Sequence, residues 1–236
     1  MKVFANRIGF SRAAMIVSAF FVAASCTSTT GTHVQLNQTA VSKIHSVGVV
    51  VKKEEEFSVR LSREKMTDAG AAFFGLVGVG IEAGARASTD SRYRERLKPA
   101  LGDFDPVAAL GERARQTLAA CERFAQVQCL PADNPTNDRT EAYDGILEIT
   151  LLQWGMRPCL GPGGAEREEV QAALNLHSRM ILTRDKTTIW DRDELYLEGT
   201  CHSIEQLSSH GTLLRDALMR AVNAAAGRIT NEILFP

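Results

Sequence analysis

The stretch 143–157, YDGILEITLLQWGMR, decides the fold. Its apolar residues alternate along an extended chain, which predicts a long β-strand. Two further strands are predicted after it, at 170–183 and 187–198. A loop that contains Gly and Pro precedes the second strand, and the polar turn RDK at 184–186 precedes the third. Together the three segments predict an antiparallel meander.

The segments before and after the meander complete an α+β plan. IHSVGVVV at 44–51 predicts a first strand and FAQVQCL at 124–130 a second. An Asp followed by Pro predicts a helix over about 105–122, and a stripe of apolar residues predicts a closing helix over 213–234. We therefore expect a mostly antiparallel sheet, in the order strand, helix, strand, three-strand meander, covered by helices.

The third strand of the meander has two apolar faces. Ile189, Leu195 and Leu197 share one face, and Trp190 and Tyr196 share the other. The aromatic pair has two interpretations: an exposed binding surface, or a second buried face under the helices. We favour the buried face because aromatic side chains dominate protein cores.

A Gly-rich helical insertion is predicted at about 66–98. Its apolar part, AGAAFFGLVGVGI at 69–81, is too short to cross a bilayer, which needs about 20 residues. Small residues four apart let helix backbones approach closely. Three interpretations stay open: a buried helix, a membrane-surface or partner-binding segment, and a flexible loop. In the second interpretation the contacting residues are Phe73, Phe74, Leu76, Gly80 and Gly84.

The start of the chain has the features of a bacterial export signal. Residues 1–12 carry three basic residues and no acid, and the run 13–24 is apolar apart from one serine. It leads into VAASC at 22–26, which resembles a lipoprotein cleavage and lipid-attachment signal. By this resemblance, Cys26 is the acylated first residue of the mature chain. Ala23 stands where such signals usually have Leu, and an ordinary secretory peptide is the alternative.

This signal defines the expected domain organisation. A signal peptide covers 1–25, a lipidated flexible tether 26–42, and a periplasmic α+β domain 43–236. The resemblance implies contact with the lipid bilayer through Cys26. Thr27 favours the outer membrane, facing the periplasm, over the inner membrane. The leader removes three of the 27 basic residues and none of the 28 acids, and the acidic balance that is left argues against nucleic-acid binding.

The other four cysteines predict two disulfides, because an oxidising compartment favours their pairing. Cys159 follows the first meander strand and Cys201 follows the third. In an antiparallel meander these two strand ends lie on the same edge of the sheet. We therefore expect a Cys159–Cys201 bridge, which leaves Cys121 to pair with Cys129.

Two motifs typical of catalysis are absent from the sequence. It contains no GxSxG and no HExxH, and its five histidines lack metal-ligand spacing. Asp191 and Asp193 share a face of the third meander strand. They could hold a cation, but solvation of the strand beside Arg192 is the preferred interpretation. We expect no catalytic residue, no metal and no cofactor, and we expect that the protein is not an enzyme.

The pattern as a whole resembles a group of small envelope lipoproteins. The features that carry the resemblance are Cys26, the strand IHSVGVVV, the Asp105-Pro106 helix, the strand DGILEITLLQW, the strand IWDRDELYLEG and the helix 213–234. The group comprises relatives of the Tol-Pal translocation protein amino-terminal domain, the curli secretion lipoprotein and the activators of penicillin-binding proteins. The resemblance implies a non-catalytic binding or assembly factor with a protein partner in the envelope. The alternative is a membrane-inserting or pore-associated component that uses 69–85.

Overall fold

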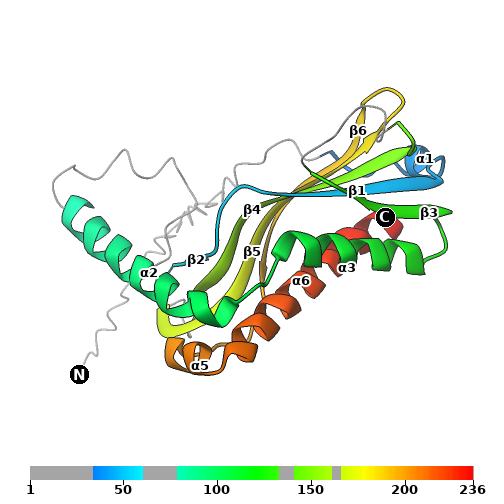
Figure 1. Cartoon of the computed structure of the whole chain (residues 1–236). Coiled ribbons are helices and arrows are strands. Elements are labelled where there is room, and N and C mark those ends of the chain that lie inside the picture. Colours follow the sequence, from blue (N-terminus) through cyan, green and yellow to red (C-terminus); the bar gives the residue numbers. More distant parts are fainter. Residues whose placement is uncertain (1–33, 61–78, 133–140, 161–165, 236) are drawn as a thin grey trace, which may run out of the picture. The chain divides into compact units, whose positions relative to one another are not determined.

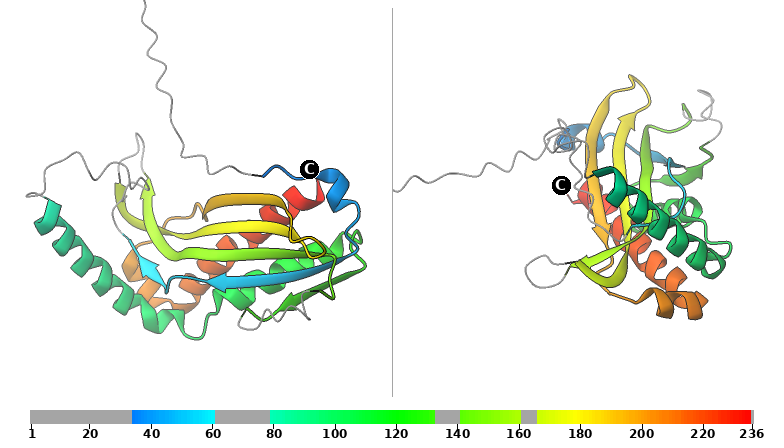
Figure 2. Two further views of the ribbon diagram at one scale, coloured as in Figure 1. Left: turned by 90° about the horizontal axis from the view of Figure 1, so that it is seen from above. Right: turned by 90° about the vertical axis from the view of Figure 1, so that its left-hand side faces the viewer.

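The computed structural model describes residues 34–60, 79–132, 141–160 and 166–235. Strands and helices form the predicted α+β arrangement, with helices lying on one face of a mixed sheet (Figures 1 and 2). The sheet order is β3-β1-β4-β5-β6, and the short β2 also pairs with β4. The strands are β1 Ser46–Lys53, β2 Ser58–Val59, β3 Gln126–Leu130, β4 Gly145–Leu160, β5 Glu166–Leu182 and β6 Thr188–Leu197.

The helices pack as a layer whose centre is the contact between α3 and α6. Asp105 begins α3: its side chain accepts hydrogen bonds from the N–H groups of Val107 and Ala108, as expected for an N-cap. An apolar stripe buries α6 against the sheet and α3. The helices are α1 Gln38–Val41, α2 Val79–Leu101, α3 Pro106–Ala120, α5 Ile204–Ser209 and α6 Gly211–Leu234.

The meander β4-β5-β6 is antiparallel, as predicted. Alternation along β4 turns Leu147, Ile149 and Leu151 toward the helices, where all three are fully buried. β1 differs in kind, because it lies parallel to both of its neighbours, β3 and β4. Two parallel strands need a crossover connection, and α3 lies on that connection between β1 and β3.

On β6 the helix-facing side is the aromatic one. Trp190 and Tyr196 are buried under the helix layer, which confirms the buried interpretation of this pair. Leu195 and Leu197 lie on the opposite side and are each 44% exposed. Ile189 shares their side but is buried. The helices therefore cover the aromatic face of the strand and leave two leucines at its end in contact with solvent.

The last part of the expected tether, residues 34–42, belongs to the fold. Asn37 caps α1 by accepting a hydrogen bond from the Ala40 N–H, and Val41 is fully buried. Asn37 also donates its backbone N–H to the carbonyl of Ile189 on β6. The prediction of a flexible tether over 26–42 is therefore wrong for 34–42. The polar, threonine-containing composition of this segment does not indicate that its backbone forms hydrogen bonds with the edge strand β6.

Several predicted features lie outside the described residues. These are the signal peptide 1–25, Cys26, and the contact residues Phe73, Phe74 and Leu76. Gly80 and Gly84 fall within α2, which overlaps the predicted insertion. In Figure 1 this helix extends past the end of the sheet, and its C-terminal part packs on α5 and α6. None of the described helices is long and apolar enough to span a bilayer.

One of the two predicted disulfides is present. Cys159 and Cys201 are bonded, with their Cα atoms 6.1 Å apart. Cys121 and Cys129 are free thiols, so the second predicted bridge is wrong. Because β3 runs back along α3, Cys129 Sγ lies 3.6 Å from the position that a Cβ atom on Gly111 would take. Gly111 is ten residues, or about 15 Å, along the helix from Cys121, and a disulfide needs Cα atoms within about 7 Å.

Candidate functional site

The edge of β1 is open beyond the end of β3. β3 accompanies β1 only as far as the pair Val50 and Leu130, whereas β4 pairs with β1 as far as Lys53. Pro131 follows β3 and has no N–H to donate, so the ladder stops there. Glu54 donates its N–H to a carbonyl of β4. Because backbone groups alternate in direction along a strand, the N–H and C=O groups of Lys53 point away from β4. Within the described residues, no strand pairs with this part of β1 on the side away from β4.

A groove of about 830 Å³ lies along this open edge, between β1, β3 and the start of α3. Below we call it the β1 groove. Its apolar lining comes from Val49, Val51 and Val107, together with Ala108 on the exposed side of α3. Gly111 lets the helix approach closely, because a Cβ atom there would lie 3.3 Å from a methyl group of Val51.

Two ionisable side chains at the β1 groove, Glu112 and Cys129, have shifted pKa values. Glu112 accepts two hydrogen bonds from Arg115 and one from Gln116, which lower its pKa to about 2. The carboxylate is thus held ionised on the surface of α3. Burial raises the pKa of the Cys129 thiol. A neutral thiol is a weak nucleophile, so this groove is better suited to binding than to covalent chemistry.

A second hollow of about 560 Å³ adjoins the first, and Lys53 lines both. Its floor contains Trp154, whose indole N–H donates to the carbonyl of Glu55 at 3.0 Å. Phe57 packs edge-on against the Trp154 ring, with centroids 5.3 Å apart. Lys98 lies at the rim and has no ion-pair partner among the described residues. Both hollows flank the start of α3, so an extended ligand could run from one to the other.

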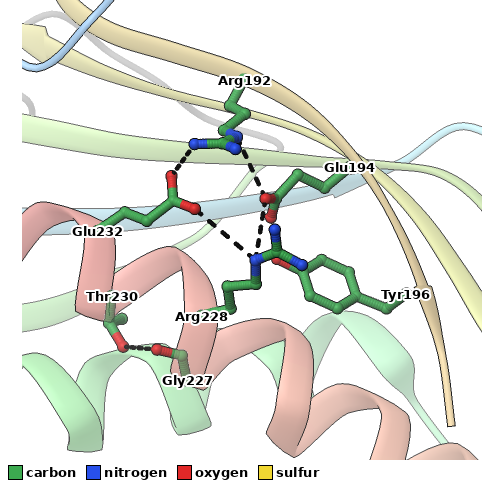
Figure 3. Close-up of polar contacts among 7 residues, drawn as sticks. All are labelled: Arg192, Glu194, Tyr196, Gly227, Arg228, Thr230 and Glu232. Atoms are coloured by element: carbon green, nitrogen blue, oxygen red, sulfur yellow. Dashed lines mark hydrogen bonds and ion pairs between the residues drawn. The ribbon is translucent and has the colours of Figure 1, made fainter.

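A cluster of four charged side chains and one tyrosine fastens β6 to α6 (Figure 3). Arg192 Nη1 lies 2.7 Å from Glu232 Oε2, and Arg228 Nε lies 3.4 Å from Glu194 Oε1. Tyr196 donates its hydroxyl to Glu194 and lies under the Arg228 guanidinium. Burial raises the pKa of Glu194, and the nearby Glu232 adds to the effect. The two carboxylates and the two guanidinium groups of the cluster form ion pairs with one another.

The sheet face opposite the helices carries a second charge network. Glu148 on β4 accepts hydrogen bonds from Lys52 of β1 and Arg179 of β5. Burial alone would raise the pKa of Glu148, but the two cations outweigh it and lower the pKa. The network ties three neighbouring strands together across this face.

Asp191 and Asp193 share this face, as the alternation predicted. Both lie beside His177 of β5: its Nδ1 is 2.7 Å from Asp193 Oδ1 and 3.8 Å from Asp191 Oδ1. The two carboxylates therefore flank an imidazole. Within the described parts of the chain, no group of three or more His, Cys, Asp or Glu side chains could hold a metal ion.

No family model and no curated protein matches this sequence. Among solved structures, it is similar to the PelC dodecamer from Paraburkholderia phytofirmans, at 14% identity and a TM-score of 0.35, over 81% of this chain and 94% of that chain. Protein XCC0632 from Xanthomonas campestris, of family model DUF330, is 10% identical with a TM-score of 0.46, over 85% and 91%. Lipoprotein GNA1162 from Neisseria meningitidis is 16% identical with a TM-score of 0.25, over 79% and 99%.

All three proteins are bacterial, and one is a lipoprotein by name. With TM-scores below 0.5, these likenesses assign neither a family nor a function to this chain. The resemblance to the Tol-Pal, curli and penicillin-binding-protein lipoproteins stays a prediction.

Reasoning from the sequence missed the β1 groove. Its walls come from β1, α3 and β3, which are distant in the chain and meet only through the parallel pairing. Two local signals point toward it: Pro131, which ends β3 early, and Gly111, a small residue on the buried side of α3. Neither signal by itself shows that the edge beside it is open.

Proposed function

We propose that this chain is an acylated lipoprotein of the bacterial cell envelope that binds an extended segment of an envelope protein in the β1 groove, without catalysing a reaction. The observation that carries the proposal is that, among the described residues, no strand pairs with β1 beyond Val50 on the side away from β4, where the β1 groove lies. Extended peptides add to such edges through backbone hydrogen bonds, and neighbouring apolar pockets select their side chains. Val107 and Ala108 would contact alternate side chains of the bound segment.

The cellular location in this proposal rests on three features. The sequence VAASC resembles a lipid-attachment signal at Cys26. The Cys159–Cys201 bridge supports folding in an oxidising compartment, where structural disulfides persist. Thr27 favours the outer membrane, with the domain facing the periplasm.

The groove is tested by crosslinking in cells that express the full chain. A photoreactive side chain at Ala132, which lines the groove, should capture an envelope protein through one extended segment, located by mass spectrometry. Ala108→Arg places a bulky cation in the groove and should abolish this crosslink. Ala119→Arg is the matched control, because Ala119 is also exposed on α3 but does not line the groove. A crosslink that survives Ala108→Arg, or that both variants abolish, contradicts the proposal.

The anchor is tested separately. Cys26→Ser removes the acylated thiol, so the variant should leave the membrane fraction and appear as a soluble periplasmic protein. A variant that stays with the membrane would show that the anchor lies elsewhere in the chain. Because the groove is untouched by this substitution, the two tests fail independently.

A further inference from the structure

The hollow of about 560 Å³ beside the β1 groove contains one base that its own carboxylates do not neutralise. Below we call it the aromatic hollow, after Phe57, Phe104 and Trp154 in its lining. Charged side chains also line it, three basic and three acidic: Lys53, Arg94 and Lys98, and Glu56, Glu95 and Asp105. Whether the hollow attracts an anion depends on which of these charges are already paired.

Each of the three acids at the aromatic hollow has a partner. The carboxylate of Asp105 caps α3 by accepting hydrogen bonds from two backbone N–H groups of its first turn. Glu56 Oε1 lies 3.0 Å from Lys53 Nζ, and Glu95 Oε1 lies 3.7 Å from Arg94 Nε. The two basic partners are thereby accounted for, and one base remains.

The remaining base is Lys98. Its side chain is exposed on α2, and none of the described carboxylates forms an ion pair with it. The half-buried Leu101 and Phe104 supply apolar surface in the same hollow. An ammonium group without a partner, next to apolar surface, is complementary to a carboxylate on a peptide, because a charged hydrogen bond is stronger than a neutral one.

We propose that the segment bound in the β1 groove carries a carboxylate that pairs with Lys98 in the aromatic hollow, an inference that rests on the proposed function. The carboxylate belongs to an Asp or Glu side chain of the segment, or to its C-terminus. The segment thus joins two kinds of contact: backbone pairing at the edge of β1, and one ion pair beyond it.

The two hollows form a continuous path for such a segment. Lys53 lines both of them. The start of α3 also lines both, with Asp105 and Pro106 at the aromatic hollow and Val107 and Ala108 at the β1 groove. Because the backbone groups of Lys53 point away from β4, a strand that pairs with them enters the aromatic hollow with its next residues.

A carboxylate fits the donors of this hollow better than a phosphate does. Phosphate sites at the start of a helix use several free backbone N–H groups. At the start of α3 the N–H groups of Val107 and Ala108 already bond to Asp105, and Pro106 has no N–H. Lys98 is left as a single donor group, which suits a carboxylate.

Peptide binding to the full chain, purified in detergent, tests the pairing. The probe is an array of synthetic ten-residue peptides of random sequence. Ala108→Trp fills the β1 groove without adding a charge, so peptides that bind the parent and Ala119→Trp but not Ala108→Trp are groove peptides. These peptides should carry Asp, Glu or a free C-terminus at one common position.

Lys98→Gln should weaken the groove peptides about 5-fold at low salt, and the difference should shrink at high salt, which screens an exposed pair. Replacing the peptide's Asp or Glu by its amide, or amidating its C-terminus, identifies the source of the carboxylate. The peptide without its carboxylate should bind the parent and Lys98→Gln equally. Lys98→Glu should prefer peptides with Lys at that position. Lys43→Gln is the matched control, because Lys43 is exposed outside both hollows.

The outcomes separate this proposal from the proposed function. Groove peptides without a common carboxylate, or groove peptides that bind Lys98→Gln as tightly as the parent, would overturn the pairing with Lys98 and leave the β1 groove as a binding site. An array with no peptide that depends on Ala108 would contradict both.

Discussion

Removal of the Cys159–Cys201 bridge should destabilise the domain by about 4 kcal/mol. The bridge closes a segment of 42 residues, which contains all of β5 and β6. In the chain-entropy model, opening a loop of this length frees the unfolded chain by about 13 cal/mol/K, or about 4 kcal/mol at 25 °C. Cys159 and Cys201 lie close together in the folded domain, with Cα atoms 6.1 Å apart, so we expect opening the bridge to change the free energy of the native state little.

Urea unfolding followed by tryptophan fluorescence measures this loss. Trp154 and Trp190 are both buried, so their emission should shift as the sheet opens. We expect the same decrease from reductant and from the double variant Cys159→Ala with Cys201→Ala. The control is Cys121→Ser with Cys129→Ser, which should keep the full reductant effect because these thiols are free. A decrease below about 1 kcal/mol, or a control that no longer responds to reductant, would refute the reasoning.

Two further pairs of variants should respond in opposite directions. Gly155→Ala should lower the free energy of unfolding in urea by at least about 2 kcal/mol, because Gly155 has a φ of +138° and a Cβ atom there would lie 1.8 Å from the Ser58 carbonyl oxygen. Gly227→Ala on α6 should leave the free energy of unfolding unchanged or raise it slightly, because a Cβ atom there meets nothing within 4 Å. Glu194 has a raised pKa, so its stabilising effect is lost as pH rises, and Glu194→Gln should be more stable than the parent at pH 8 but not at pH 4. Glu148 has a lowered pKa, so its contribution is present above its usual value of 4.5, and Glu148→Gln should be less stable at pH 8 with the difference fading toward pH 3. Urea midpoints at high and low pH that do not show these opposite signs would contradict the assigned directions of the two pKa shifts.

The parts of the fold that the sequence predicts are those set by local alternation. Leu147, Ile149 and Leu151 recur every second residue, and this pattern is sufficient to predict the meander and, through its strand ends, the Cys159–Cys201 bridge. The position of β1 between β3 and β4 depends on pairing between residues about a hundred positions apart, which no local pattern encodes. The same limit explains the error at Cys121 and Cys129, because spacing in the chain does not show that β3 runs back along α3.

The candidate site was less accessible from the sequence than the fold. The β1 groove requires knowing where β3 stops relative to β4, and hence the register of two separate pairings. The docking of 34–37 on β6 escaped prediction because backbone hydrogen bonds, available to almost any side chain, hold it there. The exposed Leu195 and Leu197 show the limit of alternation, which separates two faces of a strand but does not say which one the helices cover.

The parallel placement of β1 also determines the order in which the chain can fold. Ser46 contacts Asp144, 98 residues later, and β1 joins β4 just beyond this point. At a synthesis rate of 5–20 residues per second, β1 exists for roughly 5–20 s before its partner has been made. Hairpins β4-β5 and β5-β6 can close locally, whereas β1 can pair with β4 only across this long interval. β3 is made before β4 and is therefore the first strand that the apolar run SVGVVV can pair with; until β3 has been made, this run has no strand beside it.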